Sequence, residues 1–237
     1  MDLDQQRNYY DRRWAESTLE ELDSDQVVRL EQILRALAMI ADRPRPWRIL
    51  EVGCGTGWLS GILLRYGKVT GIDLSRVGID IARKRYPQVE FIARDIFAEP
   101  LPPIHDLVVA SESIEHVIDQ GRFVDLLVDA ACPGGYLLLT TPNGRVERRW
   151  KRRPDFHPQP IEQWLHLRAL RVLLSRRCEV RWLTTFFYDF DREGLYGLIH
   201  NPWYEGAMKR LGLSDLASRL WGRLGLGLYA VALARRR

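Results

Sequence analysis

The feature that most constrains the fold is a glycine-rich segment, residues 53–57 (Gly-Cys-Gly-Thr-Gly), which directly follows the apolar run 47–52. Glycine has no side chain, so such a loop lets backbone N–H groups approach a ligand closely. The same arrangement binds dinucleotides, and a Gly-x-Gly pattern alone does not identify the ligand. Here the third glycine comes one residue earlier than in the dinucleotide fingerprint, and Glu51 stands two residues before the first glycine. The loop therefore predicts a ligand site at the end of a strand, and the surrounding sequence has to specify the ligand.

Short β-rich runs alternate with helical patterns along most of the chain. Strands are predicted over residues 47–52, 69–73, 89–93, 106–110, 136–141, 178–187 and 228–234. Helices are predicted over residues 25–41, 58–65, 75–85, 122–131 and 160–175, with Ser75 as an N-cap and Pro133-Gly134-Gly135 as the turn before the fifth strand. Strands that alternate with helices form a parallel sheet covered by helices on both faces. The chain is therefore predicted to be an α/β protein.

The composition is that of one globular domain, with 237 residues of which 46% are hydrophobic and 28% are charged. No apolar run approaches the roughly 20 residues that cross a bilayer, so no transmembrane segment is expected. The acidic start of the chain is unlike a signal peptide, which predicts a cytoplasmic protein. Three widely spaced cysteines, Cys54, Cys132 and Cys178, predict neither a disulfide framework nor a Cys-x-x-Cys metal site. The net charge of +4 weakly favours an anionic partner.

Segment 51–57 resembles the first motif of class I S-adenosylmethionine-dependent methyltransferases. The chain as a whole resembles their ubiquinone-pathway-like, type 11 group. Four further segments resemble the later motifs of this family in the expected order: Gly71-Ile72-Asp73-Leu74-Ser75, Phe91-Ile92-Ala93-Arg94-Asp95-Ile96, Leu107-Val108-Val109-Ala110-Ser111 and Gly134-Gly135-Tyr136-Leu137-Leu138-Leu139-Thr140-Thr141. The resemblance implies a Rossmann-like, seven-stranded, mostly parallel sheet with helices on both faces and an antiparallel last strand. We predict a single methyltransferase domain (1–237) with an N-terminal helical cap (1–46), a cofactor-binding core (47–143) and a substrate-side region (144–237) that includes a helical insertion (194–227).

The resemblance further implies that S-adenosylmethionine is the cofactor. The residues implied to bind it are Glu51, Gly53, Cys54, Gly55, Gly57, Asp73, Leu74, Asp95, Ile96 and Ser111. In this family the glycine loop holds the methionine end, Asp73 accepts hydrogen bonds from the ribose hydroxyls and Asp95 binds the adenine amino group. The backbone at Ser111 faces the methionine amino group. This placement agrees with the rule that open α/β sheets bind ligands at the carboxyl ends of their strands.

The chemistry beyond the cofactor is expected in the segment 111–117 (Ser-Glu-Ser-Ile-Glu-His-Val), directly after the fourth strand. If a helical turn begins there, Glu112, Glu115 and His116 share one face. They could bind a divalent metal such as Mg²⁺, or His116 and Glu115 could be catalytic, with the histidine as base for an oxygen nucleophile. The Glu-x-x-Glu-His pattern resembles both ubiquinone-pathway O-methyltransferases and small-RNA terminal 2′-O-methyltransferases, whose metal site uses a further histidine. His157 is the candidate for that fourth ligand.

Three segments have two interpretations each. The basic run 145–153 is either a solvated surface or an attractor of anions at the rim of the site. Residues 9–14 (Tyr-Tyr-Asp-Arg-Arg-Trp) are similar to an N-terminal segment that closes over the cofactor in many small-molecule methyltransferases, or they simply pack a helix. Residues 203–225 form either a helical hairpin packed on the domain or a lid or lipid-facing surface.

These observations together predict methyl transfer from S-adenosylmethionine to a small organic molecule, at a hydroxyl oxygen. The long apolar segment before the last strand favours a hydrophobic substrate, and the basic run favours an anionic one. Nucleic acid is not the expected partner, because no RNA-binding module is present in the sequence. Two alternatives stay open: metal-assisted methylation of an RNA terminal 2′-hydroxyl, and a non-catalytic domain that keeps the cofactor fold as a scaffold.

Overall fold

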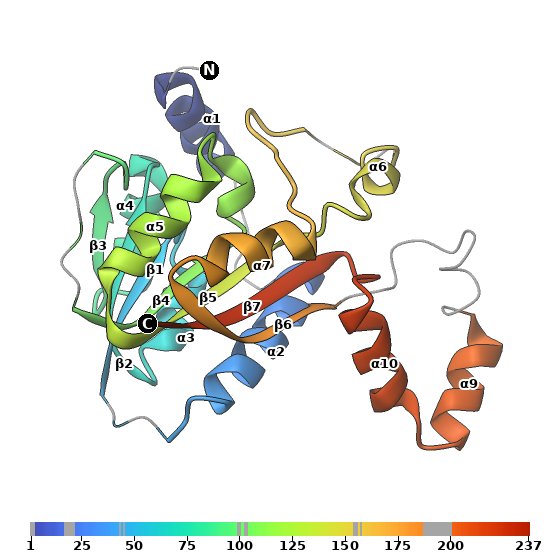
Figure 1. Ribbon diagram of the computed structural model, residues 1–237. Helices are drawn as coiled ribbons and strands as arrows, with labels where there is room; N and C mark the ends of the chain where they lie inside the picture. Colours follow the sequence, from blue (N-terminus) through green and yellow to red (C-terminus); the bar gives the residue numbers. More distant parts are fainter. Residues whose placement is uncertain are drawn as a thin grey trace.

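A seven-stranded sheet forms the centre of the computed structural model, which describes residues 3–16, 22–42, 44, 46–98, 101, 104–153, 156, 158–186 and 201–237 (Figure 1). The strands are β1 (Trp47–Val52), β2 (Gly67–Asp73), β3 (Glu90–Ala93), β4 (His105–Ser111), β5 (Ala131–Pro142), β6 (Cys178–Phe186) and β7 (Tyr229–Arg236). Their order is β3-β2-β1-β4-β5-β7-β6. Strand β7 is antiparallel to both of its neighbours, and the pairings among β1 to β5 are parallel. The predicted Rossmann-like sheet, mostly parallel with an antiparallel last strand, is confirmed.

Helices cover both faces of the sheet and bury two separate apolar layers. One layer holds α2 (Ser24–Ala38), α3 (Trp58–Leu63) and α4 (Arg76–Arg85), and the other holds α5 (Gln120–Ala130) and α7 (Leu167–Ser175). Strand β4 shows why both layers form. Leu107 and Val109 enter the first layer while Val108 and Ala110 enter the second, because successive side chains of a strand point to opposite faces.

Two predicted boundaries are wrong. The helix expected from residue 160 begins at Leu167, because the chain before it is extended: Leu165 forms a parallel bridge with Asn143, and Gly144 N donates to Leu165 O at 3.0 Å. The turn expected at residues 133–135 lies inside β5 instead. The β4–β5 register shifts there: His105 pairs with Ala131 and Leu107 with Tyr136, and Gly134 between them has a φ of 72°.

The other α-helices in the described part of the chain are α1 (Leu3–Ala15), the short α6 (Glu147–Trp150) in the basic run, α9 (Pro202–Arg210) and α10 (Ser214–Arg223). Helices α9 and α10 form a hairpin that protrudes from the body of the molecule between β6 and β7 (Figure 1). The described part of the predicted insertion is therefore helical, while its residues 194–200 lie outside the described residues. In the part of the chain that the structure describes, no helix is long and apolar enough to cross a membrane.

Candidate active site

A cavity of about 800 Å³ lies at the carboxyl ends of the central strands. Its walls come from the loop after β1, the end of β2, the turn after β4, helices α1 and α2, and the extended segment 159–164. Between β1 and β4 the strand order reverses direction, and open α/β sheets bind ligands at this switch point. The volume is within the range of small-molecule sites, roughly 300–1,000 Å³.

The glycine loop forms the floor of one half of the cavity. Gly53, Gly55 and Gly57 have φ values of 76°, 51° and 80°, which residues other than glycine rarely adopt. A Cβ atom at Gly53 would lie 2.1 Å from Ser113 Oγ, so the backbone there has no room for a side chain. The backbone N–H groups of Gly53 and Cys54 both donate to Ile72 O, at 2.8 and 3.1 Å, which fixes the loop against β2.

Two of the predicted cofactor residues support this loop without lining the cavity. Glu51 is buried beneath the loop, where it accepts a hydrogen bond from Ser60 Oγ, and burial raises its pKa to about 8. Gly57 begins α3, and a Cβ atom there would meet the Phe91 ring at 2.7 Å. The other predicted cofactor residues do line the cavity: Gly53, Cys54, Gly55, Asp73, Leu74, Asp95, Ile96 and Ser111.

Asp73 lies at the carboxyl end of β2 with both carboxylate oxygens engaged. Oδ2 accepts from Gly55 N and Oδ1 accepts from Ser75 N, each at 2.8 Å. Burial raises the pKa of this carboxyl, and the two backbone donors oppose that rise. A carboxylate oxygen accepts more than one hydrogen bond. The side chain is therefore fixed in position and still has acceptor capacity toward the cavity.

Helix α1 crosses the cavity and contacts both of its halves. The Trp14 ring lies 2.8 Å from the position of a Cβ atom at Gly55, so the indole covers the glycine loop. Trp14 Nε1 is buried and has no hydrogen-bond partner among the described residues. The Asp11 carboxylate accepts from Ser75 Oγ and Val77 N at the start of α4. At the other end of the helix, Gln6 Nε2 donates to the backbone oxygen of His116 at 2.7 Å.

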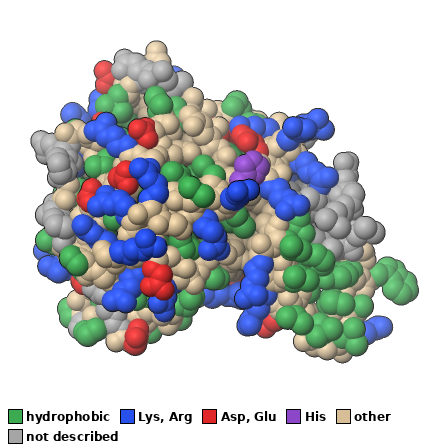
Figure 2. Space-filling model, in the orientation of Figure 1, with side chains coloured by type: hydrophobic (Ala, Val, Ile, Leu, Met, Phe, Trp, Pro, Cys, Tyr) green, Lys and Arg blue, Asp and Glu red, His purple; other side chains and the backbone are tan. Residues whose placement is uncertain are grey.

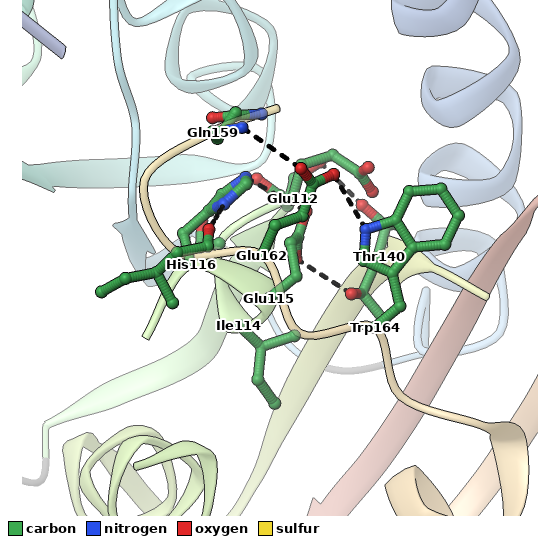
Figure 3. A network of polar contacts seen from close by, with 12 residues as sticks. Glu112, Ile114, Glu115, His116, Thr140, Gln159, Glu162 and Trp164 are labelled. Carbon is green, nitrogen blue, oxygen red and sulfur yellow. Dashed lines mark hydrogen bonds and ion pairs between the residues drawn. The ribbon is translucent and has the colours of Figure 1, made fainter. Parts of the chain in front are cut away.

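The acidic and histidine residues after β4 form the second half of the cavity. The helical turn expected from Glu112 is wrong, because Glu112 has a φ of 52° and only residues Ile114–His116 form a 3₁₀ turn. Glu112, Glu115 and His116 nevertheless line the same cavity, and Figure 3 shows their side chains close together with that of Glu162.

The His116 ring is held in one orientation by the segment that follows the basic run. Its Nδ1 lies 2.8 Å from Ile161 O, and a carbonyl can only accept, so we assign the ring proton to Nδ1. Nε2 is then left as an acceptor, 3.6 Å from Glu115 Oε1. Burial lowers the pKa of His116, which favours the neutral ring. This arrangement can accept a proton from a bound group.

Of the two glutamates next to His116, Glu115 is buried and Glu112 is partly buried, and the two interact with each other. Glu115 Oε2 accepts from Thr141 Oγ1 at 2.9 Å, and burial raises the pKa of Glu115 to about 7. Burial and the proximity of Glu115 raise the pKa of Glu112 to about 8, and Arg29 opposes this shift. Among the residues that the structure describes, no group of three or more His, Cys, Asp or Glu side chains is arranged to hold a metal ion. The fourth predicted ligand, His157, lies outside the described residues.

Arg29 is a residue of this cavity that sequence reasoning missed. Its guanidinium lies 3.8 Å from Glu112 Oε2 and over the ring of Tyr229, 5.5 Å from the centroid. Arg29 Nε and Glu112 Oε1 are buried and have no hydrogen-bond partner in the described chain. A signal was present: Arg29 precedes the buried Ile33 by four residues, so it falls on the apolar face of α2.

The wall opposite Arg29 comes from segment 159–164 and α6. Glu162 accepts from Trp164 Nε1 at 2.9 Å and from Gln159 N at 3.2 Å, and Tyr10 OH donates to Gln159 Oε1 at 3.1 Å. Trp150 and Trp164 also line the cavity. This half of the site therefore combines aromatic surface with a few fixed polar groups.

Comparison with known proteins identifies the class. Residues 21–177 match the family model described as a methyltransferase domain. The chain therefore belongs to this family, and its motifs and sheet place it among the class I S-adenosylmethionine-dependent methyltransferases.

Several curated relatives match part of the chain. A ubiquinone biosynthesis O-methyltransferase of Alkalilimnicola ehrlichii is 35% identical over 123 residues, which are 49% of this chain and 48% of the relative. A trans-aconitate 2-methyltransferase of Variovorax paradoxus is 32% identical over 44% of this chain and 42% of the relative. The chain thus spans about half the length of the curated relatives it matches, or somewhat less.

Solved structures share the fold along nearly the whole chain. The N-methyltransferase NodS of Bradyrhizobium japonicum, in complex with S-adenosyl-L-homocysteine, has a TM-score of 0.67 at 17% identity and covers 98% of both chains. The magnesium protoporphyrin IX methyltransferase of Synechocystis, with bound S-adenosylmethionine, has a TM-score of 0.62 at 15% identity and covers 100% of this chain and 98% of that one. At these identities the likeness shows the fold alone.

Proposed function

We infer that this methyltransferase acts on a hydroxyl oxygen of a small organic molecule, with His116 as the general base. The observation that carries this proposal is the partly buried His116 ring, whose Nδ1 donates to Ile161 O and whose Nε2 is left as an acceptor beside Glu115. Oxygen nucleophiles need a base because a neutral hydroxyl must lose its proton as it attacks. The curated relatives include O-methyltransferases by name, which supports the same acceptor atom.

The residues of the first half of the cavity fit S-adenosylmethionine. The left-handed glycines leave the loop backbone open to the cavity, Asp73 offers fixed carboxylate oxygens, and Trp14 Nε1 is a buried donor without a partner in the described chain. Gly53, Cys54 and Gly55 would hold the methionine end, Asp73 the ribose, and Leu74, Asp95 and Ile96 the adenine. When bound, the cofactor supplies an electrophilic methyl group on a sulfonium.

His116 and Glu115 have different roles in the proton transfer. His116 Nε2 accepts the proton of the acceptor hydroxyl, while Ile161 O keeps the ring in place through Nδ1. The ring becomes a cation in this step, and the Glu115 carboxylate, 3.6 Å from Nε2, stabilises that charge. Thr141 Oγ1 holds Glu115 in position. Binding the acceptor in line with the methyl carbon accounts for much of the remaining catalysis.

The walls of the second half define the kind of acceptor. Trp150 and Trp164 suit a flat, largely apolar body, and Arg29 and Glu112 each present a buried polar atom that lacks a partner among the described residues. Arg29 Nε can donate to a carbonyl or carboxylate oxygen next to the reacting hydroxyl, and Glu112 Oε1 can accept from a further donor group of the acceptor, while the reacting hydroxyl itself faces His116. We therefore assign the site to a small hydroxylated molecule with an aromatic or otherwise apolar body.

A product screen tests the acceptor assignment directly. The purified chain is incubated with S-adenosylmethionine and paired compounds that differ only in a hydroxyl or an amine, and mass spectrometry records products heavier by one methylene. We expect methylation of hydroxylated members, and methylation confined to amines would overturn the assignment.

The same assay after exhaustive chelation tests the alternative of metal-assisted RNA methylation. We expect activity to survive chelation, whereas a loss of activity that Mg²⁺ restores would favour the metal-dependent alternative. A folded chain that fails to bind S-adenosylhomocysteine in calorimetry would support the scaffold alternative.

Replacing Arg29 tests the acceptor side of the cavity. We expect Arg29→Met to raise the KM of the acceptor found in the screen about tenfold, the effect of about 1.4 kcal/mol from one charge-assisted hydrogen bond. The affinity for S-adenosylhomocysteine should not change, because Arg29 lies in the other half of the site. Arg29→Met also leaves the Glu112 carboxylate without its nearby cation, so the double variant Arg29→Met, Glu112→Gln serves as the stability control. A lower melting temperature with an unchanged KM would show that Arg29 has a structural role only.

A further inference from the structure

The hairpin of α9 and α10 exposes an unusual amount of apolar surface. Trp203, Leu211, Leu216 and Leu220 are 89%, 65%, 64% and 52% exposed. Leu213, Leu216, Leu220 and Leu224 recur every three or four residues, so they form one stripe along α10. Figure 2 shows hydrophobic side chains gathered over this hairpin. Contiguous exposed apolar patches of this kind mark binding surfaces.

The leucine stripe is not needed to hold the hairpin together. The two helices pack through their other faces: Trp221 Nε1 donates to Tyr204 OH at 3.0 Å, and the two rings lie 6.4 Å apart. The base of the hairpin is tied to the sheet, because Thr185 Oγ1 donates to Gly222 O at 3.1 Å. The side chains of the stripe take no part in these contacts and are 40–64% exposed.

Basic side chains border the stripe. Arg219 and Arg223 each follow a stripe leucine by three residues, which places them beside it on the helix surface. Lys209 and Arg210 lie in the last turn of α9. The acids Glu205 and Asp215 are outnumbered by these four cations. Arg145, the first residue of the basic run 145–153, contacts the end of α10, because its Nη1 donates to Leu224 O at 2.7 Å.

We propose that the α9–α10 hairpin docks this enzyme onto an anionic phospholipid membrane. The leucine stripe and Trp203 enter the interface, and the flanking arginines and lysines meet the lipid phosphates, which is the pattern of a helix that lies in the membrane plane. A second copy of the chain is a poorer occupant. A symmetric contact would bring this basic patch against itself, and like charges in contact oppose association.

The position of the hairpin connects the membrane to the cavity. Leu228 and Tyr229 line the cavity and follow α10 by a few residues. The chain thus runs directly from the base of the hairpin into the cavity wall. Docking extends the proposed function to acceptors that reside in lipid, and it does not depend on which atom is methylated.

Flotation with lipid vesicles tests the docking. The full chain is mixed with phosphatidylcholine vesicles, with or without phosphatidylglycerol, and centrifuged through a density gradient. We expect the chain to float with the anionic vesicles, to float less at high salt, and to remain at the bottom with the neutral vesicles. Leu216→Ser, Leu220→Ser should reduce the bound fraction at least tenfold, and Arg219→Gln, Arg223→Gln should remove the preference for anionic lipid. The matched control Met39→Ser, Val172→Ser removes exposed apolar groups elsewhere and should float like the parent.

Three outcomes would overturn the proposal. They are a parent chain that does not float, a leucine variant that floats as well as the parent, and a parent that sediments as a dimer while the leucine variant sediments as a monomer. The last result would assign the stripe to a second copy. Calorimetry with S-adenosylhomocysteine on each variant keeps this test separate from the proposed function, because the substituted residues lie outside the cavity.

Discussion

Asp73→Ala is expected to lower the affinity for S-adenosylhomocysteine about a hundredfold. A carboxylate that accepts two hydrogen bonds from adjacent hydroxyls contributes about 3 kcal/mol, which is close to a hundredfold in the dissociation constant. The substitution has a second effect on the site itself. Gly55 N and Ser75 N both donate to this carboxylate, so its removal also frees the glycine loop and the start of α4. Isothermal titration calorimetry measures the loss directly.

The control for this prediction is Asp73→Asn. The amide keeps the shape of the side chain and one acceptor oxygen, so the affinity should fall between that of the parent and that of Asp73→Ala. Thermal unfolding of both variants shows whether the fold is retained. An Asp73→Ala variant that binds S-adenosylhomocysteine as tightly as the parent would refute the assignment of Asp73 to the ribose.

His116→Gln is expected to lower kcat by roughly 10²- to 10⁴-fold, the usual contribution of a positioned general base. Glutamine retains a donor that can reach Ile161 O, but it cannot accept a proton at neutral pH. The affinity for S-adenosylhomocysteine should stay unchanged, because His116 lies beyond the glycine loop. The measurement is steady-state kinetics with the acceptor identified by the product screen.

The pH profile gives a second readout for His116. A general base acts when it is neutral, and burial lowers the pKa of His116 from its ordinary value of 6.5. The rising limb of kcat/KM that belongs to His116 should therefore lie below pH 6.5, and a further rise near pH 7 should belong to Glu115, whose pKa burial raises to about 7. His116→Gln should lack the limb below pH 6.5. Glu115→Gln should keep the limb and shift it to lower pH, because the imidazolium loses the carboxylate that stabilises it.

The parts of the fold that could be predicted from the sequence depend on local signals. Strand β1, the glycine loop and α3 follow one another within segment 47–63, and Ser75 caps α4 through Gly78 N as its position predicted. The residues proposed to bind the cofactor depend on equally local signals, because they lie at or just after the ends of strands. Glu51 is the instructive exception, since a motif position predicts a role but does not say whether the side chain points up into the site or down beneath it.

The parts that could not be predicted depend on contacts between distant segments. Arg29 belongs to the site only because α2 packs beside β7, which brings it over Tyr229. The orientation of His116 depends on Ile161, and residue 161 was expected in a helix. Trp14 covers the glycine loop, which is compatible with the interpretation of residues 9–14 as a segment that closes over the cofactor. The contact between Gln6 and His116 had no signal in the sequence.

The antiparallel pairing of β6 with β7 has a consequence for how this chain can diverge. Phe186 and Tyr229 are paired neighbours, and Gly227 N donates to Thr185 Oγ1 at 2.8 Å, so the whole segment between the two strands starts and ends at one closed point of the sheet. Its length and composition can change without shifting the register of any strand, because a longer loop adds little to the entropic cost of closing the loop. We therefore expect that a segment grafted from a relative would change the membrane affinity of the enzyme and leave its affinity for S-adenosylhomocysteine unchanged.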